Sequence, residues 1–370
     1  MKKFPVAKPF IDQNDISEVV KVMKSGVLSL GPKYIKFEND IAKYAGTKYA
    51  CAVSNGTCGL HLAVKALNLR PGDEVITSPF SFISSSNCLL FERVVPKFVD
   101  IQETTFNMDP AYLEKSLTKK TKAILVVHIF GQSADMTEIT RFAKRHNLRI
   151  IEDSCESLGS TYKEKMTGTI GDVGVYAFYP NKQMTTGEGG ILVTNSKKIR
   201  DMCVSLRNQG RNTRNDWLVH ERMGYNYRID EMSASLGVTQ LKKLNWMINE
   251  KRKIASWYSA ALGAHPSIRV PVIGAKRTHS WFVYVIRLIN GSRDAVMEKL
   301  ETEHISTKPY LPVIHLQPFM KKKFGYRPGS FPIAEKISSQ TLALPFYIGL
   351  TRADVAYISK KIINATEKYD

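Results

Sequence analysis

The chain has 370 residues, of which 43% are hydrophobic and 24% charged, and its formal net charge is +19 at pH 7. These proportions are typical of a globular protein, and the length suits one large domain with a smaller one. No apolar run approaches the roughly 20 residues that a membrane-spanning helix needs, so we expect no membrane association. The five cysteines are widely spaced and include no C-x-x-C pair, which favours reduced thiols and a cytoplasmic location.

The positive charge leaves three explanations open: nucleic acid, a nucleotide diphosphate ligand, or a basic surface without a specific partner. The basic residues are scattered, apart from short runs such as 321–323. The sequence has no zinc-finger spacing, no basic region followed by heptads and no aromatic RNA-binding signature. We therefore expect neither a nucleic-acid partner nor a metal site.

Segments with strand and helix patterns alternate through the first half of the chain. Strands are expected at 48–55, 70–82, 94–101, 122–131 and 148–155, followed by two more in "VGVYAFYP" and "GGILVTN". Helices are expected at 58–69, 112–121 and 136–147. This alternation predicts an α/β fold with a mostly parallel sheet, and the continuous apolar run at 122–131 is typical of a parallel strand buried on both faces.

The pattern changes after about residue 240. A long amphipathic helix is expected at 240–262, a strand at 280–289, and helices at 292–304 and 357–369. We therefore predict a large α/β domain over 1–245 and a smaller C-terminal α+β domain over 246–370, with the first residues of the chain packing on the smaller domain.

Polar groups stand at the ends of three predicted strands, in "SNGT", "EDS" and "YPNK". Ligands of parallel sheets bind beyond the carboxyl ends of the strands, so these segments are expected to meet in one crevice. Gly56 and Thr57 open a helix, where unpaired N–H groups and the helix dipole favour an anion, although an ordinary helix cap explains them too. The glycines form neither a dinucleotide fingerprint nor a P-loop.

Three further side chains suggest what this crevice does. Asp153 either caps a turn or keeps a heterocyclic nitrogen protonated, because a bare buried carboxylate is costly. Lys182 is either a solvated charge or a desolvated amine that attacks carbonyls. Phe82 is either a core aromatic or a flat group over a ring. An anion site, a carboxylate and a nucleophilic lysine together suit pyridoxal 5′-phosphate (PLP).

Eight motifs occur in an order that resembles the DegT/DnrJ/StrS-type nucleotide-sugar aminotransferases, which are fold-type I PLP enzymes. They are "SNGTCGLHLA", "TSPFSFISSSN", "HIFGQSADM", "IIEDSCESLGS", "GTIGDVGVYAFYPNKQMTTGEGG", "LRNQGR", "GYNYRIDEMSASLGVTQL" and "YLPVIHLQPF". The resemblance covers nearly the whole chain. It implies a large, mostly parallel α/β/α domain that binds PLP and a smaller C-terminal α+β domain.

The resemblance also implies roles for individual residues. Lys182 would form the Schiff base with PLP, and Asp153 would pair with the pyridinium nitrogen. Gly56 and Thr57 would bind the phosphate. Asn226, in "GYNYR", would reach the phosphate of the partner subunit, so the active form would be a homodimer with shared sites.

The resemblance also implies a role for Phe82 and candidate substrate contacts, and two positions depart from the family pattern. Phe82 would stack on the PLP ring. Many members have Ser at the position of Ala177, and Gln or His at that of Glu156, near the PLP phenolate. An ionised Glu156 would repel this oxygen, so it is either protonated or turned away. Three residues are candidates for contacts with substrate: Arg228, Tyr310 and His315.

Within the family, the motifs look most like sugar C4-aminotransferases of the perosamine-synthase kind. These use L-glutamate and a nucleotide-linked 4-keto-6-deoxyhexose, often for surface polysaccharides or antibiotic sugars. A C3-aminotransferase and a non-catalytic regulator of the same fold are the alternatives. A dehydratase branch has His in place of the lysine, and Lys182 argues against that branch.

Overall fold

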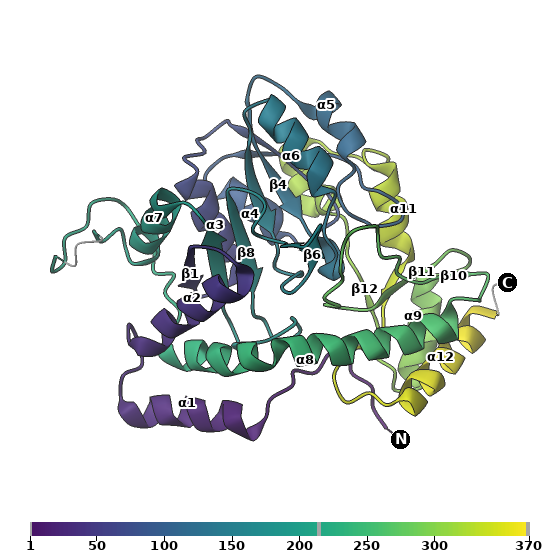
Figure 1. The fold of residues 1–370 in the computed structure, drawn as a ribbon. Coiled ribbons are helices and arrows are strands. Elements are labelled where there is room, and N and C mark those ends of the chain that lie inside the picture. Colours follow the sequence, from purple (N-terminus) through teal and green to yellow (C-terminus); the bar gives the residue numbers. More distant parts are fainter. Residues whose placement is uncertain (1, 213–215, 368–370) are drawn as a thin grey trace.

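A computed structural model describes residues 2–212 and 216–367 of the chain (Figure 1). Its larger sheet has seven strands in the order β1-β9-β8-β5-β4-β2-β3. In that order their bounds are Tyr49–Val53, Gly190–Thr194, Val173–Ala177, Arg149–Asp153, Thr121–Val127, Glu74–Thr77 and Val95–Phe98. Only β9 is antiparallel to its neighbours, β1 and β8. The predicted mostly parallel α/β sheet is confirmed.

Alternate residues of the central strands enter different apolar layers, as the 2-residue period of a strand requires. In β4, Leu125 and Val127 pack in the core with α3 (Gly56–Ala66), whereas Ile124 and Val126 pack in the core with α6 (Met136–Arg145). This two-sided burial explains the uninterrupted apolar run in the sequence. Helices α4 (Ser84–Leu90) and α7 (Lys197–Arg207) belong to the same side as α3.

Two N-terminal helices that the sequence pattern did not predict pack on a long helix. They are α1 (Gln13–Ser25) and α2 (Pro32–Ala45), and the long helix is α8 (Glu231–Leu262), which has 32 residues (Figure 1). A capping box at Asp12 begins α1 and a left-handed Gly26 ends it. These caps explain why a short helix forms there.

The smaller sheet has four antiparallel strands in the order β10-β11-β13-β12. Their bounds are Ile268–Arg269, Val285–Leu288, Thr341–Ala343 and Lys308–Pro309. Helices α9 (Arg293–Thr302) and α12 (Arg352–Thr366) pack together beside it, and Phe4 joins their apolar cluster. Because α8 runs without a break through position 245, the chain passes from one sheet to the other within a single helix.

Three expected helices differ from the structure. The long helix expected at 240–262 begins earlier, at Glu231, after the cap at Asp230. The helix expected at 112–121 is only η1 (Pro110–Tyr112) and α5 (Leu113–Ser116), because Leu117 is extended and β4 begins at 121. The terminal helix begins earlier than 357, where Thr351 and Asp354 form a capping box. The last residues of its expected range, 368 and 369, lie outside the described residues.

The remaining elements are short. They are β6 (Thr161–Tyr162), β7 (Lys165–Met166), η2 (Ile129–Gly131), η3 (Ile314–Leu316), α10 (Pro318–Phe324) and α11 (Pro332–Gln340). Within residues 2–212 and 216–367, no helix is long and apolar enough to cross a membrane.

Candidate active site

A cavity of about 750 Å³ lies at the carboxyl ends of β1, β5 and β8. The predicted convergence of the three strand ends is therefore confirmed. Of the residues singled out from the sequence, the cavity is lined by Gly56, Thr57, Phe82, Asp153, Glu156, Ala177, Lys182 and Tyr310.

Asp153 ends β5 and is almost fully buried. The hydroxyl of Ser85 donates a hydrogen bond to its Oδ2 at 2.7 Å, and the N–H of Cys155 donates to its Oδ1 at 3.2 Å. Both donors are neutral, and among the residues that the structure describes no cation pairs with this carboxylate, which lines the cavity. Sequence reasoning missed Ser85, which lies 68 residues away in the chain.

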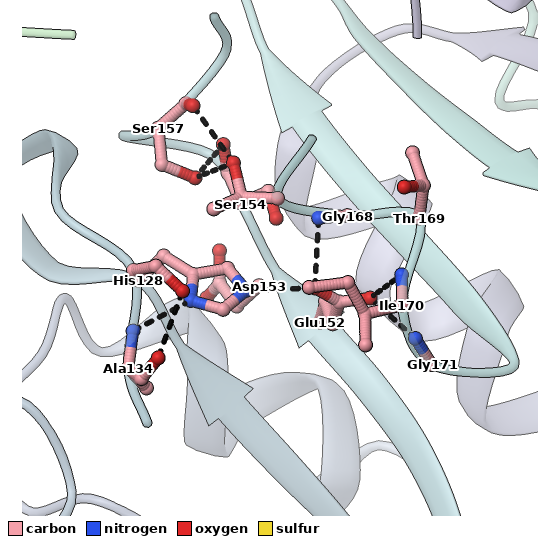
Figure 2. Close-up of polar contacts among 12 residues, drawn as sticks. His128, Ala134, Glu152, Asp153, Ser154, Ser157, Gly168, Thr169, Ile170 and Gly171 are labelled. Atoms are coloured by element: carbon pink, nitrogen blue, oxygen red, sulfur yellow. Dashed lines mark hydrogen bonds and ion pairs between the residues drawn. The ribbon is translucent and has the colours of Figure 1, made fainter. Parts of the chain in front are cut away.

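A second buried carboxylate, that of Glu152, fixes the strand that carries Asp153 (Figure 2). Its oxygens accept hydrogen bonds from the backbone N–H groups of Gly168, Ile170 and Gly171 at 2.8, 2.6 and 2.6 Å. His128 Nε2 lies 2.8 Å from Oε2. Because His128 Nδ1 accepts the N–H of residue 134, Nε2 carries the proton and donates to Glu152. Glu152 thus connects β5 to the loop that enters β8.

Lys182 lies in the turn after β8, where its N–H donates to the carbonyl of Tyr179 at 2.9 Å. Its Nζ is 3.5 Å from Glu156 Oε1 and 4.0 Å from the centroid of the Phe282 ring. The Phe282 ring shields one side of the amine from water. Nothing in the sequence pattern pointed to Phe282, which follows the large domain by many residues.

Glu156 occupies the position where the sequence departs from the family pattern. Burial raises the pKa of this carboxyl above its usual range, although the Lys182 ammonium and the Phe130 N–H oppose the rise. The Phe130 N–H donates to Oε2 at 2.9 Å. Burial therefore favours the protonated acid, one of the two alternatives that the sequence left open.

The N-terminus of α3 forms the third part of the site. Asn55 caps the helix by accepting the N–H of Cys58 at 2.9 Å. A Cβ atom at Gly56 would lie 2.8 Å from the Cβ of Ala177 and 3.0 Å from Cys155 Sγ, so only glycine leaves this end of the helix open. Such a terminus suits a phosphate.

Two hydroxyl groups lie at this helix end. Thr57 Oγ1 and Ser84 Oγ are 2.7 Å apart, and both residues line the cavity. Ser84 therefore offers a hydroxyl in a region where Ala177 offers none. An open helix N-terminus, a buried carboxylate and a lysine amine in one cavity fit the phosphate, ring nitrogen and aldehyde of PLP.

The family model "DegT/DnrJ/EryC1/StrS aminotransferase family" matches residues 9–363. The chain belongs to this family. It is 35% identical to GDP-perosamine synthase of Escherichia coli O157:H7 over 98% of both chains, and 36% identical to the spore coat polysaccharide biosynthesis protein SpsC of Bacillus subtilis over 95% of this chain and 94% of that protein. The structure of S. venezuelae DesV in complex with a ketimine intermediate covers all of both chains, with a TM-score of 0.93 and 29% identity. The protein is therefore a PLP-dependent sugar aminotransferase.

In this aminotransferase, the residues expected to contact substrate lie in different surroundings. Tyr310 lines the cavity, and Asn181 Nδ2 donates to its hydroxyl at 3.4 Å. His315 lies outside the cavity lining, where it is buried and its Nε2 is 2.9 Å from Glu335 Oε1. Arg228 also lies outside the lining and donates to the side chain of Asn208 at 2.8 Å. Of these three candidates, only Tyr310 thus lines the same cavity as Lys182 within one chain.

Asn226 does not line the cavity of its own chain. It forms an isolated antiparallel bridge with Asn208, on the segment between α7 and α8. The large apolar side chains of Trp217, Leu218 and Met223, on the same segment, are 84%, 50% and 76% exposed. Asn226 therefore lies on a segment that presents apolar surface outward.

Proposed function

We propose that this enzyme transfers the amino group of L-glutamate to C4 of a nucleotide-linked 4-keto-6-deoxyhexose. The products are 2-oxoglutarate and a nucleotide-linked 4-amino sugar. The observation that carries the proposal is the lysine amine of residue 182 in a 750 Å³ cavity that also holds the Asp153 carboxylate. The similarity to GDP-perosamine synthase over nearly both whole chains supports a nucleotide-linked substrate.

In the proposed transamination, residues of this chain would have the following roles. When bound, PLP supplies a carbonyl for amino-group exchange and a ring that accepts an electron pair. Asp153 would hold a proton on the ring nitrogen, and the open end of α3 at Gly56 and Thr57 would bind the phosphate. Lys182 Nζ would take the proton from the α-carbon of glutamate and later deliver a proton to C4 of the sugar. Phe282 would keep water from this amine.

The substrate pair can be tested directly. Purified enzyme is given nitrogen-labelled L-glutamate and a panel of GDP-, UDP- and dTDP-linked 4-keto and 3-keto sugars, and mass spectrometry follows the label. The label is expected in a 4-amino product from a 4-keto sugar. Label only in products of 3-keto sugars would replace the proposal by C3 amination, and no labelled sugar from any of them would favour a non-catalytic regulator.

The role of Lys182 has its own test. Lys182→Ala should abolish turnover, whereas Lys165→Ala, which changes an exposed lysine on β7, should leave it unchanged. Both variants should unfold at the temperature of the parent. Full turnover by Lys182→Ala would remove this lysine from the mechanism.

We further infer that the active form is a homodimer and that Asn226 reaches the phosphate in the cavity of the partner subunit. The position of Asn226 outside its own cavity and the exposed apolar side chains beside it support a second copy as the occupant of this face. A cytoplasmic location is supported by the five cysteines, which are all free thiols.

A further inference from the structure

His61 is a buried histidine on α3, where only 3% of its surface is exposed. Its Nε2 lies 2.8 Å from Oε1 of Glu92, and its Nδ1 lies 3.2 Å from the hydroxyl oxygen of Tyr227. Because an ionised carboxylate only accepts, Nε2 carries a proton and donates to Glu92. Burial lowers the pKa of His61 and favours the neutral ring, so Nδ1 accepts the hydroxyl of Tyr227. The histidine therefore joins these two residues through opposite sides of its ring.

Glu92 holds a second tyrosine of the same segment. Its Oε1 also accepts the hydroxyl of Tyr225 at 2.9 Å, and its Oε2 accepts Lys65 Nζ at 2.9 Å. The rings of Tyr225 and Tyr227 stack on each other, with 4.9 Å between their centroids and 13° between their planes. The centroid of the His61 ring lies 4.7 Å from that of Tyr225. His61 and Glu92 therefore hold both tyrosine hydroxyls, and the rings pack together.

Asn226 lies between these two tyrosines. The N–H of Tyr225 donates to the carbonyl of Leu206 at 2.6 Å, and the N–H of Tyr227 donates to that of Arg207 at 2.9 Å. Successive side chains of an extended segment point to opposite sides, so Asn226 points away from the side that carries the two tyrosines. Its exposure agrees with this, because Asn226 is exposed while both tyrosines are half-buried. The direction of Asn226 thus follows from the anchoring of its two neighbours.

We propose that His61 is a positioning residue: through Tyr227 and Glu92 it holds the 225–227 segment so that Asn226 faces the phosphate of PLP in the partner subunit. The inference rests on the proposed crossing of Asn226 between subunits. His61 itself does not line the cavity of its own chain. A segment that held the required orientation for only part of the time would bind PLP with an affinity reduced by that fraction.

The test compares two ligands of the full chain, PLP and pyridoxal, which lacks the phosphate. Equilibrium dialysis gives both dissociation constants. His61→Leu removes both polar contacts and keeps an apolar side chain. Its Kd for PLP should rise by about tenfold, as expected if the segment is correctly held about a tenth of the time, and its Kd for pyridoxal should stay parental. Tyr225→Phe, which removes only the bond to Glu92, should raise the Kd for PLP by a smaller factor.

A second variant separates this route from an effect of Tyr227 on the cavity that it lines in its own chain. Asn226→Ala alone should weaken the binding of PLP, and adding His61→Leu should weaken it no further, because no side chain is left to position. Tyr44→Phe is the matched control. It also removes a half-buried tyrosine hydroxyl that donates one hydrogen bond, to Asn245 at 2.7 Å, and Tyr44 does not line the cavity. This variant should bind both ligands with parental affinity.

Three results would overturn the inference: a parental Kd for PLP in folded His61→Leu, an equal loss of affinity for pyridoxal, or a further loss in the double variant. If His61→Leu does not fold, Tyr227→Phe removes the hydroxyl that His61 holds, and the same outcomes apply.

A failure of the proposed function gives a different pattern. Parental binding of PLP by Asn226→Ala would refute the crossing of Asn226 itself, and this inference with it. Dialysis involves no turnover, so a failure of sugar amination, seen in the transfer of labelled nitrogen, is distinguishable from a failure of the positioning role.

Discussion

Two buried carboxyl groups, three positions apart, meet different surroundings at the same cavity. Asp153 accepts hydrogen bonds from Ser85 and from the backbone of Cys155, which orient its carboxylate. Glu156 accepts one backbone hydrogen bond and lies 3.5 Å from Lys182 Nζ, while burial raises its pKa above the usual range. We therefore expect replacements of the two residues to have different effects: the Asp153 carboxylate is oriented by its hydrogen bonds, whereas burial disfavours the charged form of Glu156.

Amide replacements should separate these effects. Glu156→Gln should keep turnover within about threefold, because burial already disfavours the charged form that the amide cannot adopt, whereas Asp153→Asn should lose on the order of a hundredfold or more in kcat if Asp153 has the proposed electrostatic role. Steady-state kinetics at a fixed pH measures both. Equal losses in the two variants would contradict the expected difference between Glu156 and Asp153.

His279 should make the fold sensitive to acid. It is buried, its Nδ1 accepts the N–H of Trp281 at 3.0 Å, and burial lowers its pKa from 6.5 to about 3. Between these values the unfolded chain binds a proton that the folded chain does not. The stability from this group is therefore complete above about pH 6.5 and is lost as the pH falls towards 3.

The variant His279→Gln should lessen this dependence. Removing one such group should reduce the slope of the free energy of unfolding against pH by up to about 1.4 kcal/mol per pH unit in this window. Urea unfolding at several pH values between 6.5 and 4 measures the slope, and His220→Gln, which changes an exposed histidine, is the control. The same slope in all three proteins would refute the prediction.

At the scale of elements, the strand ends were the most predictable part of the site. Strand periodicity places "SNGT", "EDS" and "YPNK" at carboxyl ends, and the rule that these ends share one edge of a parallel sheet brings them together. Ser85 and Phe282 could not be found in this way. Each belongs to a segment whose position depends on tertiary packing, and a serine and a phenylalanine are unremarkable in their own segments.

The connection between β5 and the loop before β8 depends on Glu152, whose carboxylate accepts four hydrogen bonds (Figure 2). In Glu152→Gln, the amide nitrogen cannot accept, so at least one buried donor loses its partner. We expect a loss of about 1–3 kcal/mol or more in the free energy of unfolding. Denaturant unfolding measures it.

Hydrogen exchange should locate the effect. The amide of Gly168, or those of Ile170 and Gly171, should exchange faster in Glu152→Gln, whereas Glu164→Gln, which changes an exposed carboxylate nearby, should alter neither exchange nor stability. Parental protection at all three amides would show that Glu152 does not hold this loop.

At the scale of the whole molecule, the candidate site lies where the two sheets meet. Lys182 follows a strand of the larger sheet, while Phe282 and Tyr310 come from segments next to strands of the smaller one. Helix α8 links the two sheets. The sequence places a domain boundary near residue 245, within the helix that it predicts at 240–262. Periodicity missed the beginning of α8, from Glu231 to residue 239, because α8 is apolar on different faces along its length.

The proposed dimer predicts that two inactive variants restore activity when they are combined in a heterodimer. Lys182 would act in its own chain and Asn226 in the partner, so a heterodimer of Lys182→Ala and Asn226→Ala chains would contain one intact site. With random assortment half of the dimers are mixed, and about a quarter of the parental activity should return. Co-expression with two different affinity tags allows the mixed dimer to be isolated and assayed.

The control is a heterodimer of two variants that each change a residue lining the cavity of its own chain. Lys182 and Asp153 line the same cavity of the same chain, so a heterodimer of Lys182→Ala and Asp153→Asn has one lesion in each site and should regain nothing. Recovery with Asn226→Ala but not with Asp153→Asn is the pattern that only an exchange of Asn226 between subunits produces. If neither mixture recovers activity and Asn226→Ala alone is inactive, Asn226 serves its own chain, and the shared site is wrong.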